Sequence, residues 1–343
     1  MTNPFSSRFE TDAIVIGAGP VGLFAVFELG MVKLKCHVVD ALPVIGGQLT
    51  ALYPEKPIYD IPGFPRILAA DLVGRLAEQA QPFHPHMHLG VTVDSLLRLP
   101  DGRWEVGLSD GKGVVAPVVV IAAGAGAFGP NRPPLPGLAA FEGRSVFYLV
   151  NRREDLRGKR IVIAGGGDSA VDWAISLADL AARVMVVHRR GKFRAAPASE
   201  AKLKDLAAQG AVDLVVPYQL HGLEGSGGRL EAVTVATLDG QVRRLPADVL
   251  LPFFGLASDL GPIAQWGLAM DGPTLTVDPV SLATNLPGVF AIGDMAAYAG
   301  KLKLILQGFS EAAMAAQAAF AVAHPGQALH FEHSTTTGVP GIG

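Results

Sequence analysis

The most informative shortage in this sequence is of cysteine, because its 343 residues include only one, Cys36. Electron exchange with a disulfide substrate requires a pair of thiols in the enzyme, so this count excludes a dithiol mechanism. Cys36 lies in a stretch expected to form a buried strand, where an unpaired cysteine behaves as a small hydrophobic residue. We therefore expect it to fill the core and to take no part in chemistry.

Charged residues are also scarce, at 17% of the chain with a net charge of −3. This balance argues against a nucleic-acid-binding protein. The N-terminal stretch MTNPFSSRFET contains no charged-then-apolar signal segment, and no uncharged apolar run is long enough to span a bilayer. We expect a cytoplasmic protein that contacts neither nucleic acid nor membrane.

The positive charge is concentrated in the middle of the chain. Residues 128–256 contain 17 Lys and Arg against 13 Asp and Glu, whereas the remainder contains 11 against 18. A basic middle domain fits a phosphorylated cofactor and is compatible with an acidic protein partner. The length allows two domains, each with its own core.

Glycine, in contrast, is abundant, and its first cluster forms a nucleotide-binding motif. An apolar strand expected over 13–16 leads into Gly17-x-Gly19-x-x-Gly22, and a helical pattern follows. A strand, a glycine turn and a helix in this order predict a dinucleotide site. Gly17 permits the tight turn, Gly19 lets a pyrophosphate approach the backbone, and Gly22 lets the helix pack closely. The helix N-terminus then offers free N–H groups to the phosphates.

The same pattern returns 148 residues later. A strand expected over 160–164 leads into Gly165-x-Gly167-x-x-Ala170 at the start of another helix. A repeat at this distance is too long for a solenoid and indicates two nucleotide-binding domains.

The residues that end the second strand of each copy distinguish the two nucleotides. Asp40 ends it in the first copy, where a carboxylate accepts hydrogen bonds from the ribose hydroxyls of FAD or NAD. The equivalent residue in the second copy is His188, followed by Arg189 and Arg190, with Arg194 just beyond. Guanidinium groups bind phosphate oxygens through paired, charge-assisted hydrogen bonds. This copy therefore predicts NADPH, with a solvated basic loop as the alternative.

The chain has glycine- and proline-rich segments where it leaves the first domain and where it returns to it. These segments predict the domain boundaries. We expect an α/β fold with two Rossmann-like nucleotide-binding domains of the three-layer ββα type. The domain for FAD or NAD is formed by residues 1–127 and 257–343, and the NADPH domain, residues 128–256, is inserted into it. A strand expected over 284–294 ends in Asp294, which can accept hydrogen bonds from the sugar alcohol chain of a flavin. The helix expected over 304–323 would direct its positive end at the flavin ring.

Three alternating histidines, His84, His86 and His88, invite a metal hypothesis. Pro85 interrupts the strand, and no carboxylate or cysteine lies nearby in the sequence. We therefore assign no metal site.

Together these motifs resemble the thioredoxin-reductase-like flavoproteins and, within that group, the thioredoxin-reductase-type ferredoxin–NADP⁺ reductases. The resemblance covers essentially the whole chain and is strongest in GGQLTALYPEKPIYDIPGFP (46–65), GGGDSAVDWA (165–174) and AIGDMAAYAGKLKLILQGFSEA (291–312). Thioredoxin reductases carry a redox CxxC just before the second glycine motif, whereas residues 147–155 here read FYLVNRRED. The resemblance implies FAD in the domain formed by residues 1–127 and 257–343, NADPH in the inserted domain, and ferredoxin as the partner, in a homodimer. It also implies that Tyr53 stacks on one flavin face and that His333 covers the other.

The motifs and the resemblance together define two sets of expected site residues. The FAD set is Gly17, Gly19, Pro20, Gly22, Asp40, Gly47, Gln48, Tyr53, Val93, Gly293, Asp294, His333 and Ser334. The NADPH set is Gly165, Gly167, Asp168, Ser169, Ala170, His188, Arg189, Arg190 and Arg194. Hydride transfer through a flavin needs no side-chain acid, base or nucleophile, and we nominate none.

Other functions would use the same two sites. An NADPH-dependent reductase of flavodoxin, free flavin or a quinone differs only in its acceptor. We call Arg189, Arg190 and Arg194 the phosphate clamp. A non-enzymatic flavin-binding sensor would keep FAD but would not need the phosphate clamp. The presence of the clamp therefore favours an enzyme.

An acidic partner such as ferredoxin should dock on basic residues. The densest candidate group is Arg152, Arg153, Arg157, Lys159 and Arg160, with Lys301 and Lys303. Solvation of the protein surface is the alternative explanation for these charges.

Overall fold

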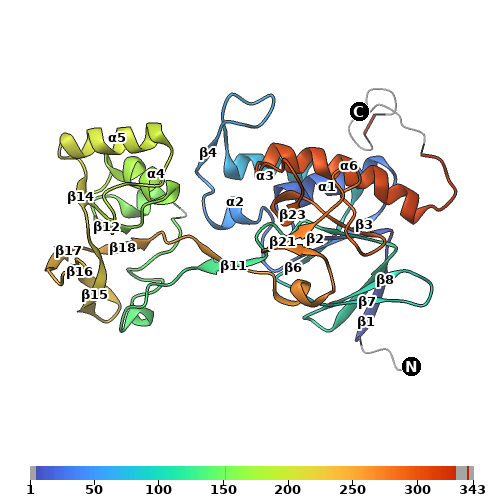
Figure 1. Ribbon diagram of the computed structural model, residues 1–343, viewed down its shortest axis with the longest axis horizontal. Helices are drawn as coiled ribbons and strands as arrows, with labels where there is room; N and C mark the ends of the chain where they lie inside the picture. Colours follow the sequence, from blue (N-terminus) through green and yellow to red (C-terminus); the bar gives the residue numbers. More distant parts are fainter. Residues whose placement is uncertain (1–4, 151, 330–337, 340–343) are drawn as a thin grey trace. The chain divides into compact units, whose positions relative to one another are not determined.

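The computed structural model describes residues 5–150, 152–329 and 338–339, and Figure 1 shows the course of the chain. It forms two compact units: the first unit comprises Met1–Phe128 and Ser258–Gly343, and the second comprises Gly129–Ala257. The chain passes from one to the other through β11 (Ala127–Pro130) and β19 (Leu256–Asp259), which pair with each other. The second unit is therefore an insertion in the first.

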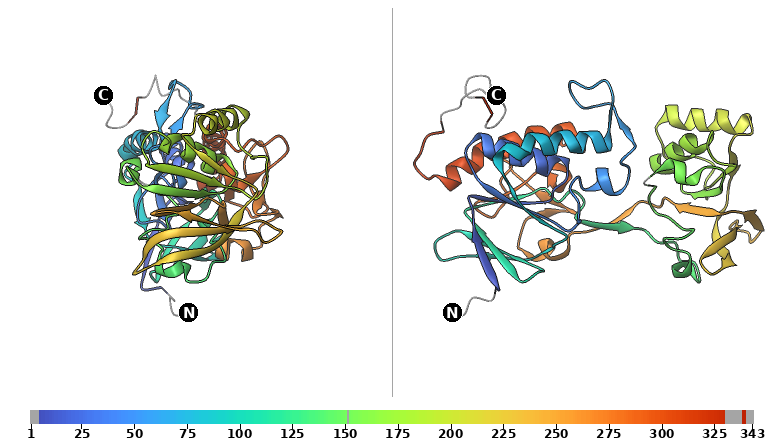
Figure 2. Two further views of the ribbon diagram at one scale, coloured as in Figure 1. Left: turned by 90° about the vertical axis from the view of Figure 1, so that its left-hand side faces the viewer. Right: turned by 180° about the vertical axis from the view of Figure 1, so that it is seen from behind.

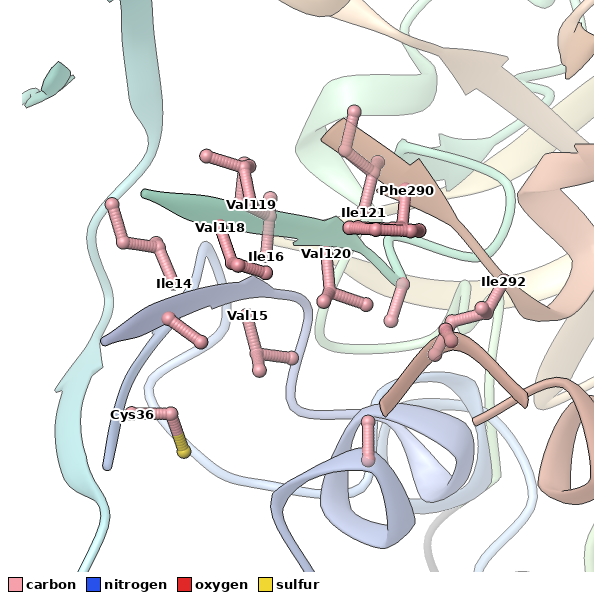
Figure 3. Close-up of a cluster of buried hydrophobic side chains, with 14 of the residues drawn as sticks. Ile14, Val15, Ile16, Cys36, Val118, Val119, Val120, Ile121, Phe290 and Ile292 are labelled. Carbon is pink, nitrogen blue, oxygen red and sulfur yellow. The ribbon is translucent and has the colours of Figure 1, made fainter. Parts of the chain in front are cut away.

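A five-stranded parallel sheet forms the centre of the first unit. In spatial order its strands are β22 (Val289–Ala291), β10 (Val118–Ile121), β2 (Ala13–Ile16), β3 (Cys36–Asp40) and β6 (His86–Leu89). All residues of β2 and β10 are buried, which explains why these strands are continuously apolar rather than alternating. Figure 3 shows their side chains packed in one cluster with Cys36 and Phe290.

Helices cover one face of this sheet, and a second sheet covers the other (Figure 2). The helices are α1 (Pro20–Met31), α3 (Ala69–Ala80) and α6 (Ile305–Ala323). The second sheet has the order β1 (Ser7–Glu10), β9 (Lys112–Ala116), β8 (Trp104–Leu108) and β7 (Val93–Arg98). These layers are the three-layer arrangement expected from the sequence. No helix within the described ranges has the length and apolar character needed to cross a bilayer.

The segment after Asp40 is more ordered than its many glycines and prolines suggest. It contains the short helix α2 (Gln48–Ala51) and the paired strands β4 (Pro57–Ile58) and β5 (Ile67–Leu68). Leu49 and Ile61 anchor it in a small apolar cluster beneath α3. This anchoring fixes the segment in place, whereas structureless loops of this length are uncommon in compact domains.

The second unit repeats the layers on a smaller scale. Its parallel sheet has the order β14 (Asp213–Val215), β13 (Arg183–Val187), β12 (Arg160–Ala164) and β18 (Val249–Pro252). On one face lie α4 (Asp168–Leu177) and α5 (Pro197–Ala208), and on the other the antiparallel strands β15 (Gln219–Ser226), β16 (Arg229–Ala236) and β17 (Val242–Pro246). Along β12, Ile161 and Ile163 face the helices, whereas Val162 and Ala164 face the antiparallel sheet. This alternation places a hydrophobic core on each side of one strand.

The strand expected over 284–294 is shorter than predicted, because β22 covers only Val289–Ala291. Pro287 and Gly288 form a turn before it, with Gly288 at φ +80°, and the Thr284 hydroxyl donates to the Val289 carbonyl oxygen (2.9 Å). The chain leaves β22 into the short 3₁₀ helix η5 (Gly293–Met295). Asp294 therefore lies in a turn beyond the end of the strand.

Three histidine rings meet at the edge of the first unit's sheet. His86 and His88 lie beside His37 of β3, with ring centroids 4.6–5.2 Å apart, and Phe9 packs against all three. His37 Nδ1 lies 3.0 Å from His88 Nε2, a hydrogen bond that requires at least one neutral ring. In the described part of the chain, no three His, Cys, Asp or Glu side chains are arranged to hold a metal ion. His37, far away in sequence, joins the cluster in place of His84.

We expect this cluster to make the protein less stable in acid. Burial, with further contributions from His86 and His88, lowers the pKa of His37 to about 4, and burial also lowers the pKa of His88. Below about pH 6.5 the unfolded chain binds these protons while the folded chain does not, so stability is lost as the pH falls towards 4. The thermal unfolding midpoint should drop between pH 7 and pH 5, and should drop less in His37→Gln.

The exposed His221 on β15 provides the matched control. His221→Gln should keep the wild-type dependence on pH. An equal drop in wild type and His37→Gln would show that the cluster does not govern acid sensitivity.

Candidate functional site

A cavity of about 380 Å³ lies in the first unit at the carboxyl ends of its parallel strands. Its wall includes residues that follow β2, β3, β10 and β22, among them Gly17, Ala41, Ala123 and Asp294. Open parallel sheets bind ligands at this edge, next to the point where the strand order reverses. Here the reversal lies between β2 and β10.

The glycine turn after β2 has no room for side chains at two of its three glycines. Gly17 has φ +112°, and a Cβ there would lie 2.4 Å from the carbonyl oxygen of Ala122. A Cβ at Gly22 would lie 1.9 Å from the carbonyl oxygen of Gly17, so α1 packs directly on the turn. At Gly19, by contrast, no atom lies within 4 Å of the Cβ position. The turn therefore keeps open space at the residue where a pyrophosphate would approach.

The N-terminus of α1 is left free to bind an anion. Gly19 is its N-cap and makes no side-chain cap, and the first turn contains no acidic residue. Its unpaired N–H groups and positive end therefore remain available for a phosphate.

Asp40, the last residue of β3, is held in place by the backbone. Its carboxylate accepts hydrogen bonds from the N–H groups of Ala18 (2.6 Å) and Leu42 (2.8 Å). Burial raises the pKa of this carboxyl, while the two hydrogen bonds lower it. Each oxygen has a second lone pair, so the group can still accept from ribose hydroxyls.

Tyr53 and Asp294 come from distant segments to the same cavity wall. The pKa of the Tyr53 hydroxyl is raised by burial and also by the charge of Asp294. The ammonium of Lys56 lies 5.7 Å from the centroid of the Tyr53 ring. An aromatic surface and a carboxylate thus lie together on this wall.

Most of the expected FAD residues line this cavity. They are Gly17, Gly19, Pro20, Asp40, Gly47, Gln48, Tyr53, Val93, Gly293 and Asp294. Gly22 packs behind the turn instead, and His333 and Ser334 fall outside the described residues. Sequence reasoning gave no site role to the 3₁₀ helix η4 (Gly261–Gln265), whose first residues also line the cavity.

These residues fit FAD. The open space at Gly19 and the free N-terminus of α1 suit a pyrophosphate, the Asp40 and Asp294 carboxylates suit sugar hydroxyls, and Tyr53 offers an aromatic surface. α6 begins at Ile305 on the same wall, again without a side-chain cap or an acidic first turn. Its positive end suits a ring that gains electron density.

The glycine turn of the second unit repeats this construction. Gly165 has φ +155°, and a Cβ there would lie 2.5 Å from the carbonyl oxygen of Phe253, which follows the neighbouring strand as Ala122 does in the first unit. Ala170 replaces the third glycine, and its methyl group lies 3.0 Å from the Cβ position of Gly165. At Gly167 the space is open. The second turn thus has the same shape.

The basic loop that follows β13 folds across this turn. The His188 ring covers Gly166, stacks on buried Phe193 (centroids 5.2 Å apart), and lies with Nε2 3.3 Å from the Lys192 carbonyl oxygen. The Arg194 N–H donates to the Gly166 carbonyl oxygen (2.6 Å). These contacts bring the phosphate clamp beside the turn. The sequence analysis gave no role to Phe193, although this residue lies within the basic stretch HRRGKFR (188–194).

Asp168 has a structural role that its place in the motif did not suggest. Its carboxylate accepts a hydrogen bond from the Ala196 N–H (2.9 Å) just before α5. It therefore ties the far end of the basic loop to the start of α4. Ser169 is exposed beside it, and Ala170 is buried.

The phosphate clamp is free to bind a ligand. Arg189, Arg190 and Arg194 are exposed, and none of them has an ion-pair partner in the ranges that the structure describes. The three charges contribute to a lowered pKa of His188, although burial of the ring is the main cause. Three unpaired guanidinium groups beside an open glycine turn suit a 2′-phosphate.

The proposed docking cations are mostly neutralised. Ion pairs join Arg153 to Asp179, Arg157 to Glu154, Arg160 to Asp248 and Lys301 to Glu311. The pair of Lys301 is buried, so this residue cannot present its charge on the surface. The docking hypothesis is wrong for Lys301 and is weakened for the three arginines.

Cys36 lies in the core, 5% exposed, and burial raises the pKa of its thiol to about 12. A thiol with such a pKa is not a nucleophile at neutral pH. The structure confirms the expected filler role.

Comparison with known proteins gives evidence that does not depend on the geometry of the two sites. A family model described as pyridine nucleotide-disulphide oxidoreductase matches residues 11–322. Ferredoxin–NADP reductases of Paramagnetospirillum magneticum and Rhodospirillum rubrum are 69% and 62% identical to the chain, over 97% and 98% of it and 99% of each relative. Thioredoxin reductase structures from Lactococcus lactis and T. acidophilum each match 91% of the chain, and 99% and 98% of their own, with a TM-score of 0.77. At 22% identity, these structures show a shared fold only.

Proposed function

We propose, since the chain belongs to the pyridine nucleotide-disulphide oxidoreductase family, that it is an FAD-dependent ferredoxin–NADP⁺ reductase. The family resemblance and the fold inferred from the motifs are confirmed. The single observation that carries the proposal is the contrast between the two glycine turns. The carboxylate of Asp40 lies beside the first turn, and the phosphate clamp lies beside the second.

The first unit would bind FAD and the second NADPH. Bound FAD would supply the chemistry, because a flavin accepts two electrons as hydride and passes them on singly. The residues of the chain bind and orient: the turn at Gly19 takes the pyrophosphate, and Asp40 takes the ribose. Tyr53 offers its ring to the isoalloxazine, and Asp294 receives the sugar alcohol chain. The tail residues His333 and Ser334 remain a prediction from the resemblance alone.

The electron acceptor follows from the cysteine count and from the relatives. Cys36 is buried and single, so the chain has no dithiol to reduce a disulfide. Relatives at 62–69% identity are named ferredoxin–NADP reductase. We therefore propose ferredoxin as the partner, flavodoxin as a second acceptor, a cytoplasmic location and a homodimer.

Reduction of cytochrome c tests the acceptor. The purified protein with NADPH should reduce cytochrome c many times faster when ferredoxin is added, because the flavin passes single electrons to the iron–sulfur protein. The stimulated rate should also fall from low to high salt, since steering between charged proteins is screened over a Debye length of about 8 Å at physiological ionic strength.

Two results would contradict this proposal. Rapid NADPH oxidation with free flavin or a quinone, but no stimulation by ferredoxin, would indicate a small-molecule reductase. Bound FAD that NADPH does not reduce would indicate a flavin-binding sensor.

A further inference from the structure

Glu311, in the alanine-rich helix α6, is completely buried, with 0% of its surface exposed. Its carboxylate accepts hydrogen bonds from the Gly293 N–H (2.7 Å) and the Tyr298 hydroxyl (2.7 Å), and it pairs with the ammonium of Lys301. Gln307 donates to the Tyr298 oxygen (2.8 Å). We call these five residues the Glu311 network. A buried charge needs such partners, and here the carboxylate has three.

The network lies directly behind one wall of the cavity. Gly293 and Asp294 line the cavity, and so does the segment 303–305. Gly293, Tyr298 and Lys301 are spaced along the stretch between these two lining segments. One carboxylate on α6 therefore fixes three points of a chain segment whose ends both form the cavity wall.

The same segment is confined from the other side by α1. A Cβ at Gly308 of α6 would lie 2.3 Å from Val21 Cγ2, and one at Gly293 would lie 3.4 Å from Val21 Cγ1. Val21 belongs to the first turn of α1, which follows the glycine motif. Gly293 thus lies between the helix that would bind the pyrophosphate and the helix that carries Glu311. A shift at either helix would reach the cavity wall through Gly293.

We propose that Glu311 is a positioning residue for the flavin. By accepting the hydrogen bond of the Gly293 N–H, it fixes the backbone from which Asp294 faces the cavity. The inference rests on the proposed function, because it assumes FAD in this cavity. A buried ion pair is weak evidence for a role in stability, since an apolar pair of similar volume can often replace it without loss of folding.

Two double variants separate positioning from stability. Lys301→Met with Glu311→Gln removes both charges but keeps a side-chain carbonyl oxygen that can accept from Gly293. Lys301→Met with Glu311→Leu removes both charges and the acceptor. We expect the Gln variant to release FAD within about threefold of the wild-type rate, and the Leu variant at least about tenfold faster, with shifted flavin absorbance bands; tenfold corresponds to the loss of one hydrogen bond.

FAD release from the purified holoprotein is followed by the rise in flavin fluorescence, and circular dichroism monitors folding. Equal release rates and identical spectra for the two folded double variants would overturn the proposal. Tyr298→Phe provides a milder test, because it removes one bond to Glu311 but leaves the Gly293 contact. Release from Tyr298→Phe should stay within about threefold of wild type, and a tenfold increase would also overturn the positioning role. A wild-type protein that binds no FAD would instead disprove the proposed function.

Discussion

Gly19→Ala is expected to give a folded protein that no longer holds FAD. The residue has an ordinary φ of −69°, and no atom lies within 4 Å of its Cβ position, so alanine fits the unliganded turn. The added methyl group would occupy the space through which the pyrophosphate approaches the backbone. Gly22→Ala, in contrast, would collide with the carbonyl of Gly17 and disturb the fold itself. Gly19 therefore separates binding from folding.

The expected loss is large. Forcing a methyl group into a filled site costs about 1–3 kcal/mol, and each charge-assisted hydrogen bond lost to the pyrophosphate costs about 1.5–3 kcal/mol more. FAD affinity should fall about a hundredfold or more. The measurement is the ratio of flavin to protein after purification, together with the thermal unfolding midpoint.

Gly74→Ala, in the middle of α3 with nothing within 4 Å of its Cβ position, is the control. It should keep its flavin and gain slightly in stability, because alanine is the better helix former. Stoichiometric flavin in Gly19→Ala would show that the pyrophosphate does not lie on this turn.

The sequence predicts best those features that depend on neighbouring residues. The strand expected over 160–164 matches β12 to the residue, since it is an apolar run with a charge at its start. Both glycine turns were recognisable because their steric needs fall within six residues. The expected strand over 284–294 failed where Pro287 and Gly288 form a turn within an otherwise apolar, strand-like run.

Long-range burial was not predictable in the same way. A glutamate in an alanine-rich helix and a lysine two residues before another lysine both indicate solvent exposure, yet Glu311 and Lys301 form a buried pair. Likewise His37 joins His86 and His88 only because β3 and β6 are neighbours in the sheet. Such contacts depend on which distant segments the fold brings together. The residues near each partner in the sequence do not indicate this.

Neutralising Arg189 and Arg190 is expected to remove the preference for NADPH over NADH. Both guanidinium groups are exposed and, within the described ranges, have no ion-pair partner, so binding a 2′-phosphate would break no existing ion pair. Each contributes about 1.5–3 kcal/mol through charged hydrogen bonds, which corresponds to roughly a tenfold to hundredfold preference. The double variant with glutamine should raise KM for NADPH accordingly and leave KM for NADH nearly unchanged.

Arg183→Gln is the matched control, because it removes one positive charge from the opposite end of β13, where Arg183 pairs with Asp213. Arg183→Gln should leave the KM values for NADPH and NADH near those of wild type. This result would show that the change in KM in the double variant is local and not due to net charge. Initial rates of NADPH and NADH oxidation with a saturating acceptor give the comparison. Equal damage with both cofactors in the double variant would mean that the arginines support the loop rather than the phosphate. The phosphate clamp would then lose its role, because NADH differs from NADPH only in lacking the group that the clamp is expected to bind.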